Sequence, residues 1–312
     1  MICTCGNLKL IILHVHLMSF KRWFMVRFKS LSLSLSLSYE ERQHEKRVSD
    51  NRGVGFSDHV QGRYTTRGMA QDAIDVMDHL GWTSNIHLVG LSMGGMITQE
   101  IAKLDLPRFR SMTLVSTIAG GISSLWLFLL RAPKGLMTLL RTFISSDPHE
   151  SLRQGSKLLF PESVLEQKVK HPKTGEITTR GDLLRRDLIE RGNQALKDGS
   201  TPLKMKTVIK QALAVCTHRT SDADLKRFSN HFVDAVLVIT GDSDILVHES
   251  NSEILAKSIK GSTLLRIPNA GHGANEQEAN LVNKAIEANI RRGILVTSRV
   301  SSSSSSSLRS RI

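Results

Sequence analysis

The chain has 312 residues, of which 40% are hydrophobic and 5% aromatic, and its formal net charge is +13. A chain of this length and composition can bury one large α/β core, with or without an insertion, which excludes a largely disordered protein. Most of the positive charge lies at the two ends of the chain, since residues 1–49 hold 8 Lys and Arg against 3 acidic residues and residues 291–312 hold 5 Arg and no acid. The net charge therefore does not indicate a nucleic-acid surface on the central part of the chain.

The sequence of the first 49 residues lacks the pattern of a folded domain. Residues 30–38 alternate Ser and Leu strictly, a pattern that repeated DNA also encodes. Residues 8–20 are apolar but too short to cross a membrane, which needs roughly 20 apolar residues. We therefore predict an atypical, disordered N-terminal segment over residues 1–49. The alternative is that the apolar residues 10–17 form a strand of the domain.

Helices and strands alternate regularly after this segment. A helix is predicted where apolar residues recur from Met69 to Leu80 at the spacing of one buried face, and Gly81 ends it. Short apolar runs then predict a strand at 86–89, a helix from 93 to 103 and a strand at 112–115.

The strand pattern stops between residues 120 and 230 and then resumes. The interrupted region is helical in pattern and basic, with 19 Lys and Arg against 11 acidic residues, and we predict a helical lid there. A strand, helix, strand and helix follow at 235–240, 249–259, 263–267 and 279–290. The predicted fold is therefore α/β, a mostly parallel sheet flanked by helices, with a core of 50–119 and 231–291. The serine run at 301–307 predicts a disordered Ser/Arg tail over 292–312.

The segment Gly90-Leu91-Ser92-Met93-Gly94 carries the strongest chemical signal. It is a G-x-S-x-G motif placed directly between a predicted strand and a predicted helix. Such a tight turn exposes a serine hydroxyl above the sheet, and its small residues let the strand and the helix approach each other closely. This context favours Ser92 as a nucleophile over a glycine-rich structural turn.

A serine nucleophile needs a base and an orienting carboxylate, and two loops at the carboxyl ends of the last strands supply candidates. His272, between Gly271 and Gly273, is the predicted base, with His248 as its nearest rival. Asp244 is the predicted acid because an Ile-Leu-Val step follows it, whereas Asp242 is better placed as a turn residue.

These motifs resemble the α/β-hydrolase superfamily, in its lid-bearing branch of esterases and lipases. The resemblance covers residues 50–290 and also includes the segment from Asp50 to Asp58, where it implies that Asp50 and Arg52 brace loops near the site. It implies that the backbone N–H of Met93 is one donor of an oxyanion hole. The second donor is unknown, because no His-Gly precedes Asp50. Residues 44–49 also show no apolar strand, so N-terminal strands of the fold are predicted to be missing.

The predicted function is hydrolysis of a carboxylic ester or related acyl substrate through an acyl-enzyme on Ser92. The alternatives are an acyltransferase or C–C bond hydrolase with the same triad, and a non-catalytic or weakly active protein that lacks part of the oxyanion hole. The expected partner is a small molecule, with no cofactor, metal or nucleic acid. The apolar residues 125–130 and 136–140 fit either ordinary packing or peripheral contact of the lid with a lipid surface. Three cysteines are too few for a disulfide framework, which favours a cytoplasmic location.

Overall fold

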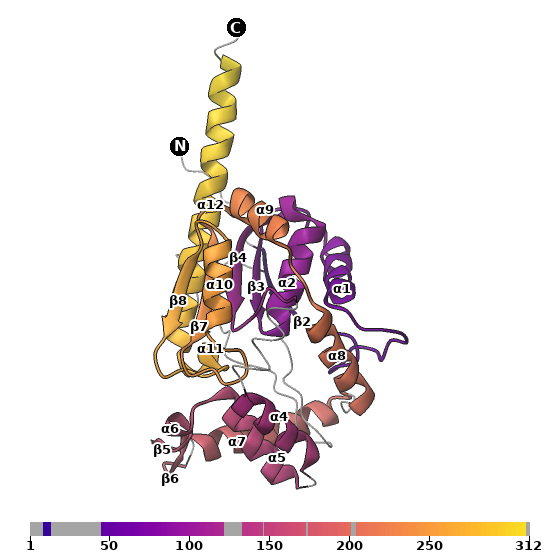
Figure 1. Ribbon diagram of the computed structural model, residues 1–312, viewed down its shortest axis with the longest axis vertical. Coiled ribbons are helices and arrows are strands. Elements are labelled where there is room, and N and C mark those ends of the chain that lie inside the picture. The colour runs from indigo at the N-terminus through magenta and orange to yellow at the C-terminus, as the bar shows by residue number, and fades with distance from the viewer. Residues whose placement is uncertain are drawn as a thin grey trace.

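A parallel sheet forms the centre of the computed structural model (Figure 1). The structure describes residues 9–13, 45–121, 133–145, 147–172, 174–200 and 204–309. Within these residues the sheet has six strands in the order β2-β1-β3-β4-β7-β8, and each neighbouring pair is parallel. The strands are β1 (Lys9–Leu13), β2 (Glu45–Ser49), β3 (Ile86–Leu91), β4 (Phe109–Val115), β7 (Val236–Gly241) and β8 (Thr263–Ile267). The predicted α/β architecture is confirmed.

The N-terminal segment supplies a strand to the interior of this sheet, which corrects the prediction that such strands are missing. β1 lies between β2 and β3 and pairs with both of them. Leu10, Ile11 and Leu13 are buried, so this strand belongs to the hydrophobic core. Residues 9–13 therefore form a strand, as in the alternative that the sequence left open for residues 10–17, and residues 14–17 lie outside the described residues.

A second strand, β2, lies directly before Asp50, where the sequence predicts none. β2 is the edge strand of the described sheet and pairs only with β1 there. Edge strands commonly carry charged side chains because these discourage pairing with other chains. The polar sequence of residues 45–49 is compatible with an edge strand. The lack of an apolar pattern therefore does not exclude a strand at this position.

Alternate strand residues face two helical layers. Leu88 and Met112 join one hydrophobic cluster with α1, α2, α9 and α10, whereas Val89 and Val115 join a second cluster with α12. This alternation is the period of two expected for a strand that is buried on both faces. The helices are α1 (Thr66–His79), α2 (Met93–Leu104), α9 (Asp222–Phe232), α10 (Ser250–Ser258), α11 (Ala274–Gln277) and α12 (Ala279–Arg309), and a 3₁₀ turn spans Leu106–Arg108.

The first helix forms as its sequence predicts. Thr65 caps α1, since its side-chain oxygen accepts a hydrogen bond from the N–H of Gly68 at 2.9 Å. Met69, Ile74 and other apolar side chains on one face are buried. Gly81 follows the helix with a φ of +66°, a conformation that glycine adopts easily.

The segment inserted between β4 and α9 is mainly helical, as predicted, but it also contains a small antiparallel hairpin that the sequence does not predict. Most of it lies apart from the sheet, below it in Figure 1. The predicted boundary at residue 230 falls inside α9, whose Phe228 packs in the core. The elements are α4 (Pro133–Ile144), α5 (Pro148–Leu159), α6 (Glu162–Leu165), β5 (Lys168–Lys170), β6 (Ile177–Thr179), α7 (Arg180–Lys197) and α8 (Met205–Thr217). The apolar residues 125–130 lie outside the described residues.

The two ends of this insertion are joined at its base. The N–H of Thr220 donates to the carbonyl of Ala119 at 2.7 Å, and the N–H of Gly121 donates to the carbonyl of His218 at 2.9 Å. The buried ring of His218 also bonds the hydroxyl of Thr66 at 3.1 Å. The insertion therefore leaves and re-enters the core at one place.

The C-terminal helix continues past the boundary predicted at residue 291. α12 runs to Arg309, so residues 292–309 are helical in the structure rather than a disordered tail. At residue 293 the absence of a side chain permits close packing, because a Cβ on Gly293 would lie 2.4 Å from the carbonyl oxygen of Arg110. Within the described residues, no helix combines the length and the apolar character needed to cross a membrane.

Candidate functional site

Ser92 lies on the turn that joins β3 to α2, as the sequence predicts. Its backbone has a φ of 54° and a ψ of −121°, a conformation that costs energy for a residue with a side chain. The strand and the helix meet closely at this turn, since a Cβ on Gly90 would lie 2.4 Å from the carbonyl oxygen of Gly94. A Cβ on Gly95 would similarly lie 2.7 Å from the side chain of Thr117. Packing therefore requires glycine at positions 90 and 95.

The neighbouring strand holds the backbone of this turn. The N–H of Ser92 donates to the carbonyl of Val115 at 2.9 Å, and the hydroxyl of Thr117 donates to the carbonyl of Ser92 at 2.6 Å. Met93 is the first residue of α2, so its N–H has no acceptor within the helix. No sequence signal identified Thr117, because its role depends on the pairing of β3 with β4.

Asp244 and His272 are in direct contact. The Oδ2 of Asp244 lies 2.8 Å from the Nδ1 of His272, and both side chains are fully buried. The Oδ1 of Asp244 accepts hydrogen bonds from the N–H groups of Leu246 and Val247, at 2.9 and 2.8 Å. These backbone donors fix the carboxylate and help to offset the cost of burying it.

The rival residues make other contacts. Asp242 accepts a hydrogen bond from the hydroxyl of Ser243 and is exposed. His248 bonds the hydroxyl of Ser250 at 3.0 Å instead of a carboxylate. Neither of these contacts pairs a carboxylate with an imidazole.

Ser92 and His272 lie at the same edge of the sheet, but no hydrogen bond joins them in the structure. The Nε2 of His272 is buried and has no hydrogen-bond partner among the described residues. A base in a ligand-free site often makes its hydrogen bond to the nucleophile only when substrate is bound. The available Nε2 is therefore the atom of this pair that could receive a proton.

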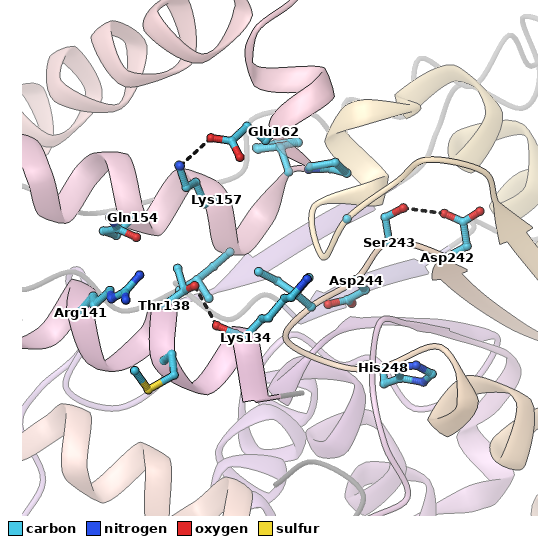
Figure 2. A pocket seen from close by; sticks show the side chains of 16 residues that line it. Lys134, Thr138, Arg141, Gln154, Lys157, Glu162, Asp242, Ser243, Asp244 and His248 are labelled. Atoms are coloured by element: carbon cyan, nitrogen blue, oxygen red, sulfur yellow. Dashed lines mark hydrogen bonds and ion pairs between the residues drawn. The ribbon is translucent and has the colours of Figure 1, made fainter. Parts of the chain in front are cut away.

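The inserted helices pack directly on the loops that carry Asp244 and His272. A Cβ on Gly135 in α4 would lie within 1.9 Å of the carbonyl oxygen of Ile245, next to Asp244. At the other loop, the N–H of Gly273 donates to the carbonyl of Leu159, the last residue of α5, at 2.8 Å. An open cavity of about 960 Å³ lies between these contacts, and Asp244 and Gly271 are among its lining residues (Figure 2).

The segment after β2 is braced as the resemblance implies. The carboxylate of Asp50 accepts a hydrogen bond from the N–H of Phe56 at 3.3 Å. Arg52 forms an ion pair with Asp72 on α1, with its Nε 2.8 Å from the carboxylate. Neither residue lines the 960 Å³ cavity.

Glu276, four residues after His272, has an unusual environment that the sequence does not reveal. Burial raises its pKa to about 7, and the charge of Arg191 on α7 opposes that shift. Sequence spacing gives no sign of this contact because α7 and α11 are far apart in the chain. Among the described residues, no group of three or more His, Cys, Asp or Glu side chains gathers as a metal site would require.

We expect the stability of the Glu276→Gln variant to depend less on pH than the stability of the wild-type protein. A folded-state pKa of about 7, against 4.5 for an ordinary glutamate, means that the folded state holds a proton more tightly than the unfolded state. The wild-type protein should therefore lose roughly 2–3 kcal/mol of stability as the pH rises through the interval between those values, and the variant should not. Urea unfolding at pH 5 and pH 8 measures this difference.

Glu278→Gln is the matched control, because Glu278 is exposed on the same segment. Identical pH dependence of unfolding in Glu276→Gln and the wild-type protein would contradict the raised pKa of Glu276.

The sequence matches a known family. The family model described as alpha/beta hydrolase fold matches residues 40–279. No curated protein matches the chain significantly.

Solved structures give a consistent likeness. An esterase from Thermogutta terrifontis is 22% identical, with a TM-score of 0.61, over 92% of this chain and 90% of that one. The enol-lactonase from Burkholderia xenovorans LB400 is 19% identical, with a TM-score of 0.60, over 92% of each chain. The 2-hydroxy-6-oxo-6-phenylhexa-2,4-dienoate hydrolase from Rhodococcus sp. strain RHA1 is 16% identical, with a TM-score of 0.64, over 91% of each chain. At these identities the likeness shows a shared fold.

Proposed function

Since this chain belongs to the family of proteins with the alpha/beta hydrolase fold, we propose that it is a serine hydrolase that cleaves a carboxylic ester or a related acyl substrate. In this proposal Ser92 is the nucleophile, His272 the general base and Asp244 the residue that orients His272. The inserted helices serve as a lid over the site. Hydrolysis needs only water as co-substrate, which these three side chains can activate.

The contact between Asp244 and His272 carries the proposal. In this proposal Nδ1 of His272 carries the proton, because the carboxylate oxygen 2.8 Å away can only accept a hydrogen bond. Nε2 is then a lone-pair acceptor, and it has no partner among the described residues. A buried histidine held in this tautomer is suited to take the proton of an attacking hydroxyl.

The reaction follows from these positions in two halves. His272 Nε2 removes the proton from Ser92 Oγ while Oγ attacks the carbonyl carbon, and the imidazolium then gives that proton to the leaving alcohol as the C–O bond breaks. Water attacks the resulting acyl-serine with His272 again as base, which releases the acid and restores Ser92. The negative oxygen of each tetrahedral intermediate requires hydrogen-bond donors.

The N–H of Met93 is the proposed first oxyanion donor, because it is the first of the N–H groups at the start of α2 that have no acceptor within the helix. No second donor is assigned among the described residues.

A fluorophosphonate probe tests the proposal, because it reacts covalently with an activated serine. We expect the purified protein to be labelled and Ser92→Ala to be unlabelled. Ser163→Ala is the matched control, since Ser163 lies in α6 and bonds Asn269. A folded wild-type protein that is not labelled, or a Ser92→Ala variant that still is, would exclude Ser92 as the nucleophile and favour a non-catalytic role.

A substrate panel then addresses the reaction type. Carboxylic esters, lactones and thioesters all present an acyl carbon to Ser92, and the names of the similar structures include an esterase and an enol-lactonase. Ester hydrolysis that depends on Ser92 supports the proposed reaction over acyl transfer.

A further inference from the structure

The last helix of the insertion, α8, exposes its large apolar residues to solvent. Met205, Ile209 and Leu213 are 49%, 54% and 58% exposed, and their spacing of four residues places them along one side of the helix. The buried residues of α8 are polar or smaller: Thr207, Val208, Gln211 and Ala214. A helix that packs on a core normally buries its large apolar residues, so packing within this chain does not explain the exposed stripe.

A loop with a further exposed apolar residue lies beside this helix. The Nζ of Lys210 donates to the carbonyl of Val60 at 3.0 Å, and the Nδ1 of His59 lies 3.0 Å from the hydroxyl of Thr207. Figure 1 shows this loop, between β2 and α1, next to α8. Val60 is itself 44% exposed. Single exposed apolar residues are common, but a group of them indicates an interaction surface. The α8 surface is formed by these four residues: Val60, Met205, Ile209 and Leu213.

The segments that form the α8 surface are basic. Residues 56–63 and 204–217 together hold four Lys or Arg residues against one acidic residue, a net charge of +3: Arg63, Lys204, Lys206 and Lys210 against Asp58. None of the four cations forms an ion pair within the described part of the chain. Burial lowers the pKa of His59, and the charges of Lys204 and Lys210 lower it further, so both lysines act on the loop as well as on the helix. The apolar stripe is therefore accompanied by positive charge that has no carboxylate to neutralise it on α8.

We propose that the α8 surface binds an anionic lipid surface. Met205, Ile209 and Leu213 enter the boundary between headgroups and acyl chains, and the neighbouring lysines contact the anionic headgroups. A helix with an apolar face beside lysines is the kind that lies in the plane of a membrane surface. A second copy of the chain fits less well, because a two-fold contact along α8 brings lysines together without an acidic residue between them. This interaction goes beyond the proposed function, since it needs no reaction at Ser92.

Sedimentation with lipid vesicles tests the proposal on the full chain. The wild-type protein should bind vesicles that contain about 30% phosphatidylserine in phosphatidylcholine, and should bind pure phosphatidylcholine at least about tenfold more weakly. The variant Met205→Ser/Ile209→Ser/Leu213→Ser keeps every charge of the chain. It should reduce partitioning into the phosphatidylserine vesicles at least about tenfold, because three apolar side chains no longer enter the membrane.

Val76→Ser/Ile254→Ser/Leu281→Ser is the matched control, because it removes three apolar side chains that are 43%, 43% and 44% exposed on other helices. It should partition as the wild-type protein does. Equal partitioning of the two serine variants, or a wild-type protein that does not bind the vesicles, would overturn the proposal. Thermal unfolding verifies that both variants are folded.

The lysines are tested by a second pair of variants. Lys204→Gln/Lys206→Gln should weaken partitioning about tenfold, because lysines close to an anionic surface each add to binding. Lys257→Gln/Lys260→Gln removes the same charge from exposed positions in and just after α10, and should change partitioning by less than about twofold. Equal losses in the two variants would mean that net charge alone attracts the protein to the vesicles, which contradicts a docking surface at α8.

Cys216 offers a direct report on this face, since it is exposed and follows Leu213 by three residues. In a Cys3→Ser/Cys5→Ser background, an environment-sensitive dye on Cys216 should brighten and shift its emission to the blue when phosphatidylserine vesicles are added. Vesicle binding without that change would reject α8 as the contact. Sedimentation velocity without lipid identifies the rival occupant. A wild-type dimer that the Met205→Ser/Ile209→Ser/Leu213→Ser variant converts to a monomer would assign the α8 surface to a second copy instead of lipid.

Discussion

The Asp244→Asn variant is expected to lower kcat by about 10⁴ while leaving KM nearly unchanged. The reason lies in how the carboxylate is held. Its Oδ1 accepts hydrogen bonds from the N–H groups of Leu246 and Val247. In the variant the amide oxygen must take that position, so the amide nitrogen faces His272. That nitrogen can only donate, which forces Nδ1 to accept and places the ring proton on Nε2. The imidazole then cannot remove a proton from Ser92.

Kinetics with a 4-nitrophenyl ester, together with a circular dichroism spectrum to verify folding, measures this effect. Asp242→Asn is the matched control, because Asp242 precedes Asp244 by two residues and is exposed. It should retain kcat within about threefold of the wild-type value, as an exposed surface group should. Similar losses in the two variants would show that the loop, rather than the orientation of His272, is what both substitutions disturb.

The sequence predicts the centre of the fold and of the candidate site because their signals are local. Gly90, Ser92 and Gly95 lie within six residues, and the structure shows why the glycines are needed. The preference for Asp244 over Asp242 also rests on a local pattern, since the N–H groups of the apolar residues Leu246 and Val247 donate hydrogen bonds to the carboxylate of Asp244. Each of these features depends on the chain immediately before and after it.

The errors arise where neighbours in space are distant in the chain. β2 has a polar sequence, as edge strands often do. It belongs to the sheet because it pairs with β1, which lies more than 30 residues earlier in the chain. The raised pKa of Glu276 and the contact of Gly135 with Ile245 each involve the inserted helices packing onto the core. No pattern within one segment reports such packing.

The second large effect is expected for Gly241→Ala, at a contact between the loops that carry Asp244 and His272. Gly241 ends β7, and a Cβ there would lie 2.1 Å from the carbonyl oxygen of Ala270 in the loop that carries His272. The same carbonyl accepts a hydrogen bond from the N–H of Ser243 at 3.0 Å. Because the obstacle is backbone, the added methyl group must push the two loops apart. Overpacking of this kind should cost about 3 kcal/mol of stability, and a shift of about 1 Å between Asp244 and His272 should lower kcat by about 10².

Urea unfolding and ester kinetics on one preparation separate these two effects. Gly68→Ala is the matched control, since the nearest neighbour of its Cβ in α1 is the Thr65 side-chain oxygen at 3.2 Å. That substitution should change stability by no more than about 1 kcal/mol, because alanine favours a helix over glycine, and it should leave kcat unaltered. If Gly241→Ala kept the kcat of the wild-type protein despite lost stability, the spacing of the two loops would not determine how His272 acts. Loss of both stability and kcat in Gly241→Ala would support a role for the contact of Gly241 with Ala270 in keeping Asp244 and His272 close together.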